Sequence, residues 1–307
     1  MTTKPQLPPG ITVFERGWLS ANNILCVGES GTALVDSGYH IHSPQTLTLV
    51  EQSLKGRPLD KLLNTHLHSD HCGGNAALQR CYPALRTFIP PGHARFVKDW
   101  DPLTLTYTPT GQFCPQFLFD DLLEPDTEVV LGSQKWQIHA APGHDTHSIL
   151  LYEPQFGTLI SADSLWERGF GVVFPELEGF SAFDEVASTL DLIERLAPLT
   201  IIPGHGKVFT NVSDSLTIAR RRLEGFVQSP ERHALHAAKA LMKFKLLEVQ
   251  RANLSELLDW LNNADYLATL HGNYFPGIPR PQWLEQLAKD LVRSGAAVFE
   301  QDYLVNA

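Results

Sequence analysis

Short apolar runs, each followed by a polar or glycine-containing turn, recur through the first two thirds of the chain. Runs of this length are typical of buried strands. The predicted strands are 11–14, 23–27, 32–36, 61–65, 136–140, 148–153, 158–163 and 200–204. In the same region, 182–197 carries apolar residues at helical spacing, and Ser181 with Asp184 supplies a capping-type start. Strands mixed with helices in this way predict an α/β architecture.

Beyond about residue 213 the strand pattern gives way to helical spacing. Predicted helices cover 213–227, 231–250, 254–263 and 281–294, and the last alternating stretch, 296–305, suits a strand or hairpin. We therefore expect a first domain over 1–225 and a mostly helical C-terminal domain over 226–307.

Two aromatic-rich stretches have no clean period. We expect 100–126 to form a long loop beside a site. The stretch 270–283 suits either a lid over a site or a packed connector between domains.

Composition narrows the class of protein. The 307 residues are 43% hydrophobic, enough to bury a large core. With 24 basic and 34 acidic side chains the net charge is −10, which argues against broad binding of nucleic acids. Residues 219–251 differ, with eight basic and three acidic side chains, and either attract an anionic ligand or form a solvated helical face. The start of the chain has no signal-like pattern, so we expect a cytoplasmic protein with no membrane partner and with its four cysteines as free thiols.

The stretch 64–75, NTHLHSDHCGGN, crowds four polar ligand-type residues into six positions. Each would need its own buried hydrogen-bond partner, so this is a poor way to build a core. In an extended segment residues two apart face the same way, so His66 and His68 can reach one ion. The following turn then redirects Asp70 and His71, a geometry that suits two adjacent metals.

Three further candidate ligands are His144, Asp163 and His205. Each ends or follows an apolar strand-like run, and α/β proteins place their chemistry at such strand ends. Zinc and similar metals bind imidazole nitrogen and carboxylate oxygen, and a catalytic site leaves one position open for water.

These motifs resemble the metallo-β-lactamase superfamily of metallohydrolases. Residues 66–71 match its H-x-H-x-D-H motif. His144, Asp163 and His205 match its later histidine, aspartate and histidine motifs, in that order. Asp36 matches the aspartate that ends an early strand in the family. The likeness covers roughly 11–212 and implies an αββα sandwich with metals at one edge. A bridging aspartate at Asp163 resembles glyoxalase II-type thioesterases, lactonases and the β-lactamase-like protein 2 nucleases more than antibiotic-degrading enzymes. The C-terminal pattern is similar to the winged-helix tail of that nuclease group.

The resemblance also implies a role for each matched residue. His66, His68 and His144 would hold one metal, and Asp70, His71 and His205 would hold the second. Asp163 would bridge them, and Asp36 would support the ligands from outside. On general grounds, His147 is either a similar support or a surface histidine. We expect two divalent metal ions, with zinc favoured and iron or manganese as alternatives. Asp70 is the candidate catalytic residue, which would orient the attacking hydroxide and take part in proton transfer.

We therefore predict a dinuclear hydrolase that uses metal-activated hydroxide to cleave a small ester-like acyl bond, a thioester or a lactone. A metal-dependent RNA nuclease is one alternative, and a binding or regulatory protein with low turnover is another. Nucleic acid is the weaker interpretation, because Lys289 and Arg293 are the basic side chains of 281–307, against four acidic ones. The expected partner is a small-molecule substrate, an anionic one if the basic side chains of 219–251 bind it.

Overall fold

The computed structural model describes residues 5–307, which divide into two compact units. The first unit comprises the chain up to Leu105 together with Phe113–Leu223, and the second comprises Thr106–Gln112 and Glu224–Ala307. Across residues 5–307 there is no helix with the length and apolar character needed to cross a membrane.

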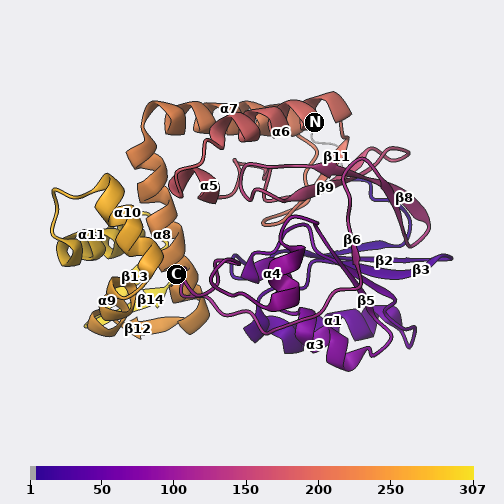
Figure 1. Cartoon of the computed structure of the whole chain (residues 1–307), viewed down its shortest axis with the longest axis horizontal. Coiled ribbons are helices and arrows are strands. Elements are labelled where there is room, and N and C mark those ends of the chain that lie inside the picture. Colours follow the sequence, from indigo (N-terminus) through magenta and orange to yellow (C-terminus); the bar gives the residue numbers. More distant parts are fainter. Residues whose placement is uncertain (1–4) are drawn as a thin grey trace. The chain divides into compact units, whose positions relative to one another are not determined.

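The first unit contains two sheets, whose strands are labelled in Figure 1. The six-stranded sheet has the order β1-β2-β3-β4-β5-β6, with β1 to β3 antiparallel and β3 to β6 parallel. Its strands are β1 (Ile11–Phe14), β2 (Asn23–Gly28), β3 (Gly31–Val35), β4 (Lys61–Leu63), β5 (Arg86–Ile89) and β6 (Asp121–Leu122).

The second sheet has five strands in the order β11-β10-β9-β8-β7. They are β7 (Glu128–Leu131), β8 (Gln134–Ala140), β9 (Ile149–Glu153), β10 (Thr158–Ala162) and β11 (Thr200–Pro203). Neighbouring strands are antiparallel except for β10 and β11, which are parallel. Every strand predicted in the first 212 residues is therefore present, within one or two residues at each end.

The main core lies between the two sheets, and the alternation of side chains along each strand builds it. Ile24 and Cys26 of β2 point into this core, whereas Leu25 between them points to the opposite face. Trp136 of β8 and Ile160 of β10 come from the second sheet to meet them.

Helices cover the outer faces of both sheets, which gives four layers (Figure 1). On the first sheet, α1 (Ser43–Leu54) and α3 (Asn75–Cys81) bury Leu54 and Leu78 against its outward residues. Beyond the second sheet lies α6 (Phe183–Leu196), with Leu190 buried. The other helices are η1 (His40–His42), α2 (Ser69–Cys72), α4 (Ala94–Asp99), α5 (Phe174–Leu177) and α7 (Val212–Gln228), the last running from one unit into the other. This arrangement confirms the predicted αββα sandwich.

The second unit is mostly helical, as predicted. Its helices are α8 (Pro230–Val249), α9 (Leu254–Asn262), α10 (Asp265–Tyr274) and α11 (Arg280–Arg293), and α11 packs on both α8 and α9. A small sheet in the order β12-β14-β13 completes it, with β12 (Arg251–Asn253), β13 (Ala297–Glu300) and β14 (Tyr303–Asn306). The last two strands form the predicted terminal hairpin.

The start of α6 differs from the predicted one. Ala182 is the N-cap residue, and no side chain at that position caps the helix, so the capping role given to Ser181 and Asp184 is wrong. Instead, Glu176 Oε2 accepts hydrogen bonds from the N–H groups of Ala182 at 2.7 Å and Phe183 at 3.2 Å. The first N–H groups of a helix have no partner within it, and this carboxylate supplies one from the preceding helix.

The irregular stretches are partly regular in the structure. The stretch 270–283 contains the end of α10 and the start of α11, and only residues 275–279 lie between these helices. Its aromatic residues did not indicate these two helix ends. Within the predicted loop 100–126, residues 101–120 contain turns but no helix or strand, whereas Asp121–Leu122 form β6. The segment Thr106–Gln112 of this loop groups with the second unit. The strand β12 was not predicted because its residues are polar and it pairs with β14 through the backbone.

Candidate metal centre

The seven predicted ligands follow strand ends of the two sheets. In the first sheet β4 ends at Leu63, and the chain then runs through His66 and His68 into α2, which carries Asp70 and His71. In the second sheet His144 follows β8, Asp163 directly follows β10 and His205 follows β11. The structure brings all seven together as two adjoining groups.

The first group, the histidine cluster, consists of His66, His68 and His144. Nδ1 of His68 lies 3.1 Å from Nε2 of His66 and 2.9 Å from Nε2 of His144, so one nitrogen of each ring faces a common point. Burial and the neighbouring histidines hold the pKa of His66 well below its ordinary value and lower that of His68 to about 4. Neutral rings keep a lone pair free for a cation, which is the ligand form that divalent metals require.

The second group, the mixed cluster, consists of Asp70, His71, Asp163 and His205. Nε2 of His205 lies 3.1 Å from Oδ2 of Asp70, and Nε2 of His71 lies 3.9 Å from the same oxygen. Burial alone would lower the pKa of His71, but the carboxylates of Asp36, Asp163 and Asp70 outweigh it and hold this pKa well above its ordinary value. A cation in this group would meet the same negative field.

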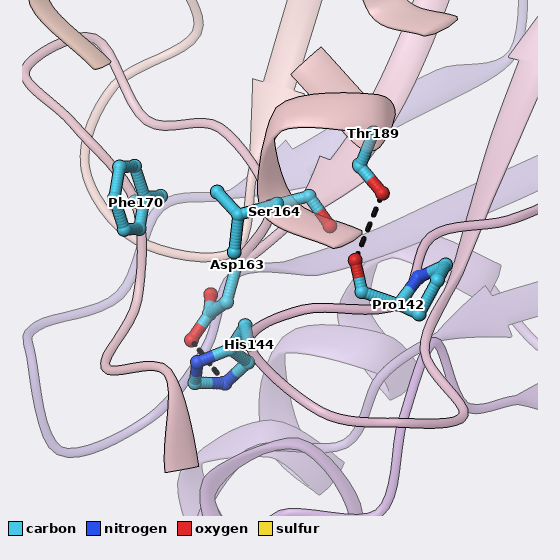
Figure 2. Close-up of a pocket in the computed structure, with 7 residues that line it drawn as sticks. Pro142, His144, Asp163, Ser164, Phe170 and Thr189 are labelled. Carbon is cyan, nitrogen blue, oxygen red and sulfur yellow. Dashed lines mark hydrogen bonds and ion pairs between the residues drawn. The ribbon is translucent and has the colours of Figure 1, made fainter. Parts of the chain in front are cut away.

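One carboxylate oxygen lies between the two clusters. Oδ2 of Asp163 is 3.5 Å from Nε2 of His144 in the histidine cluster, and 3.6 Å from Nε2 of both His71 and His205 in the mixed cluster. Figure 2 shows this carboxylate directed towards His144. Although burial would raise the pKa of Asp163, the three histidines lower it well below its ordinary value.

A divalent metal pair fits these residues. Nε2 of His71 is fully buried and has no hydrogen-bond partner among residues 5–307, yet it points at the carboxylate oxygens of the mixed cluster. An orphaned buried nitrogen is costly, and a metal ion that replaces its proton would give it a partner. Within each cluster the potential ligand atoms lie within 4.8 Å of one another, and imidazole with carboxylate is a donor set that zinc, iron and manganese accept.

Asp36 fixes the orientation of His71 from behind. Its Oδ2 accepts a 2.8 Å hydrogen bond from Nδ1 of His71 and another of 2.9 Å from the hydroxyl of Thr65. Its Oδ1 accepts the N–H of Thr65 at 2.9 Å. With φ at 58°, Asp36 is in the left-handed region, an uncommon and strained conformation that these bonds maintain.

Asp145, which the sequence analysis missed, approaches the histidine cluster from outside. Its Oδ2 lies 3.8 Å from Nε2 of His68, on the side of the ring opposite the cluster. Its Oδ1 accepts the backbone N–H of His147 at 2.7 Å, while the His147 ring packs edge-on against His93 at 4.6 Å between centroids. The sequence signal was its place directly after His144.

A short segment near the N-terminus ties the two ligand loops together. The N–H of Ala21 donates to the carbonyl of Asp70 at 3.0 Å, and the N–H of Asn22 donates to that of Gly204 at 2.7 Å. The Asn22 side chain also donates to the carbonyl of Gly206 at 2.8 Å. These bonds fix the backbone on both sides of the mixed cluster. No sequence motif predicted them.

Two tryptophans pack against the mixed cluster. The ring of Trp18, which is 55% exposed, stacks on the His205 ring at 5.3 Å, with an angle of 10° between the planes. Trp166 meets Trp18 edge-on at 5.2 Å, and its indole N–H donates to Oδ1 of Asp163 at 3.1 Å. Sequence reasoning missed both, although Trp166 follows Asp163 by three positions.

Comparisons with known proteins agree with the fold and identify the family. A family model described as the metallo-beta-lactamase superfamily matches residues 16–205. The lactamase-like protein notP of Aspergillus sp. (strain MF297-2) is 25% identical over 290 residues, covering 92% of this chain and 78% of that protein. A hydroxyacylglutathione hydrolase of Anaeromyxobacter dehalogenans is 28% identical over 229 residues, covering 74% and 78%. The crystal structure of TTHA1429, a metallo-beta-lactamase family protein of Thermus thermophilus, aligns with a TM-score of 0.57 at 18% identity and covers 98% of this chain and 100% of that one.

A sandwich of two sheets between helices, with paired histidine and aspartate clusters at one edge, defines the metallohydrolase class of α/β proteins. Because the family model spans more than half of its length, the chain belongs to the metallo-beta-lactamase superfamily. Together with the two ligand clusters, this membership supports a metal-dependent hydrolase that uses divalent metal ions.

Proposed function

We propose that the chain is a dinuclear metal-dependent hydrolase that cleaves a thioester or lactone of a small molecule. The position of Asp163 Oδ2, within 3.6 Å of ring nitrogens from both clusters, is the observation that carries this proposal. A shared carboxylate oxygen suits two cations side by side. The relative named hydroxyacylglutathione hydrolase supports a thioester as the bond, since an acyl group is joined to glutathione through sulfur.

The histidine cluster would hold one metal ion in this proposal. Asp70, His71 and His205 would hold the second, and Asp163 would bridge the two. Zinc is favoured because it accepts imidazole and carboxylate and leaves an open position for water, while iron and manganese take the same ligands. Asp36 would support His71 through its hydrogen bond. His147 would act indirectly, because its backbone N–H holds Asp145 beside the histidine cluster.

When bound, such ions lower the pKa of a water from ~15.7 towards ~7 and polarise the substrate carbonyl. The residues of the chain supply orientation and proton transfer. Asp70, whose side chain is 14% exposed, lies between the buried ligands and solvent, so its carboxylate is placed to accept a proton from the attacking water and return it to the leaving group. The His71 side chain is fully buried, so its ring does not contact bulk solvent.

The nuclease alternative is weaker because many basic side chains of 219–251 already have partners in the structure. Arg220 forms ion pairs with Asp191 at 2.7 Å and Glu194 at 2.8 Å. Lys243 donates to the carbonyl of Ala296 at 2.5 Å, and Lys245 pairs with Glu248 at 2.6 Å. A groove that binds a nucleic-acid backbone needs basic side chains that are free to pair with its phosphates.

Elemental analysis combined with a substrate panel tests the proposal. The panel contains acylglutathione and acyl-coenzyme A thioesters, lactones, a phosphodiester and RNA. We expect two metal ions per chain and hydrolysis of a thioester or lactone that chelation abolishes. Hydrolysis confined to the phosphodiester or RNA would support the nuclease instead, and a metal-loaded protein inert to the whole panel would contradict the proposed hydrolase and favour a binding role.

The role of Asp70 has its own test. In Asp70→Asn the amide oxygen can still bind a metal but the side chain cannot accept a proton, so we expect kcat to fall about a hundredfold with both metals retained. Asp184→Asn, which alters an exposed carboxylate on α6, should leave kcat unchanged. Full activity of Asp70→Asn with two metals bound would contradict the assignment.

A further inference from the structure

The two oxygens of the Asp163 carboxylate have different partners. Oδ2 faces the ring nitrogens of the two clusters, as described above. Oδ1 accepts the indole N–H of Trp166 at 3.1 Å. Trp166 thus touches the bridging candidate on the side away from the ligand nitrogens.

The Trp166 indole is held in place by a tight loop that follows β10. The backbone N–H of Trp166 donates to the carbonyl of Gly169 at 2.6 Å, and the N–H of Gly171 donates back to the carbonyl of Asp163 at 2.8 Å. Gly169 has φ at +129°, a conformation that side-chain-bearing residues rarely adopt, so the turn requires glycine. The hydroxyl of Ser161 closes the base of the loop by donating to the carbonyl of Leu165 at 2.7 Å.

Aromatic neighbours restrain the indole from the other side. Trp18 meets it edge-on at 5.2 Å, and the His205 ring does so at 5.6 Å. Since His205 belongs to the mixed cluster, the ring that donates to Asp163 also packs against a second candidate ligand. The indole is therefore fixed relative to the mixed cluster by both a hydrogen bond and ring contacts.

A carboxylate can bind a single metal through both oxygens or share one oxygen between two metals. A fixed N–H donor on Oδ1 disfavours the first mode, because that oxygen would have to give up its hydrogen bond to reach an ion. Donors outside the ligand set orient ligands in this way in other metal sites.

We propose that Trp166 is a positioning residue, whose indole N–H holds Asp163 so that Oδ2 alone is presented to both clusters. This inference rests on the proposed metal centre but concerns metal affinity rather than the reaction. Removing the donor should weaken binding of the ions that share Asp163 by ten- to a hundredfold.

Two substitutions separate the hydrogen bond from the packing of the ring. Trp166→Phe keeps an aromatic ring and loses the N–H, whereas Trp166→Gln loses the ring and keeps an N–H donor. Trp260→Phe is the control, because it makes the same change of ring in the second unit, where Trp260 packs under Lys245. Metal content by elemental analysis and Zn²⁺ affinity by competition with a chromophoric chelator are measured on each full-length protein, and thermal unfolding of the metal-free forms shows that each variant folds.

We expect Trp166→Phe to bind Zn²⁺ at least tenfold more weakly than the unaltered protein, with Trp166→Gln recovering most of the loss and Trp260→Phe within about twofold of the unaltered affinity. Unchanged affinity in Trp166→Phe, or no recovery in Trp166→Gln, would overturn the inference. If the unaltered protein binds no metal, both this inference and the proposed function fail. If it binds two metals but hydrolyses nothing in the panel, only the proposed function fails, since the affinities still decide the role of Trp166.

Discussion

Asp36 shows how a residue outside the ligand set can govern one within it. It holds Nδ1 of His71 at 2.8 Å, and this directs the orphaned Nε2 into the mixed cluster. In Asp36→Asn the side chain loses its charge and one of its acceptor oxygens, so we expect the affinity of the second metal site to fall ten- to a hundredfold. Metal titration of the full-length protein, followed by elemental analysis, measures this loss.

The control for Asp36 is a carboxylate with similar bonds at the other end of β3. Oδ2 of Asp60 accepts the N–H of Thr32 at 2.8 Å and its hydroxyl at 3.1 Å. Asp60→Asn should therefore change stability but leave the metal affinity intact. Equal metal affinities for Asp36→Asn and the unaltered protein would show that His71 keeps its orientation without this carboxylate.

Also at the residue scale, the sequence predicts site residues that belong to a spaced motif, but it does not predict residues that reach the site only through tertiary contacts. The cluster of 66–71 and the three distant ligands could be selected because each follows a strand and matches a motif. Asp145 and Trp166 could not, because what distinguishes them is the direction of a carboxylate and of an indole N–H after folding. Which of the seven binds a metal stays a prediction until metals are measured.

At the scale of elements, the start of α6 depends on a side chain from another helix. Glu176 accepts the N–H groups of Ala182 and Phe183, so Glu176→Ala should lower the free energy of unfolding by about 1 kcal/mol, the usual cost of losing a helix cap. Ser181→Ala, at the position the local pattern predicted as the cap, should have little effect. Denaturant unfolding monitored by circular dichroism compares the two, and a larger loss in Ser181→Ala would restore the local capping assignment.

This example indicates which elements a single sequence can locate. Strands such as β2 and β10 were predicted because they are apolar and buried, and long amphipathic helices such as α6 and α11 because their spacing persists over several turns. The polar strand β12 and the cap of α6 depend on partners distant along the chain or outside the element, Val305 for Arg251 and Glu176 for Ala182. The hydrophobic and polar pattern of a short segment contains no information about such partners.

At the scale of the whole molecule, the two units are not two continuous stretches of chain. The change from strand to helical pattern placed a boundary near 225, and the structural units change at Leu223 and Glu224 within α7. Thr106–Gln112, however, groups with the second unit although it lies in the middle of the first stretch. Within that unit the N–H of Tyr266 donates to the carbonyl of Pro109 at 3.1 Å, a contact across more than a hundred residues that no pattern in either segment predicts.

All seven candidate ligands lie in the first unit, so metal removal should affect the two units differently. A ligand that binds only the folded state stabilises it by about 2.7 kcal/mol when its free concentration is a hundred times Kd. Without metal, Nε2 of His71 has no hydrogen-bond partner among residues 5–307, although it lies 3.9 Å from the carboxylate of Asp70 and 3.6 Å from that of Asp163. We therefore expect chelation to raise hydrogen exchange in α2 and in the loop after β10, and to lower the unfolding temperature of the first unit.

The internal reference for this experiment is the second unit, where α8 and α11 pack around a core of their own. Amide exchange in these helices, measured by mass spectrometry on the same full-length samples, should stay the same with and without chelator. An equal rise in both units would mean that the metals stabilise the chain as one cooperative body, and no rise at α2 would mean that the mixed cluster keeps its structure without a cation. In that last case the hydrogen bonds of Asp36, Trp166 and Asn22 would be sufficient to hold the ligands in place, and the metals would be needed for chemistry alone.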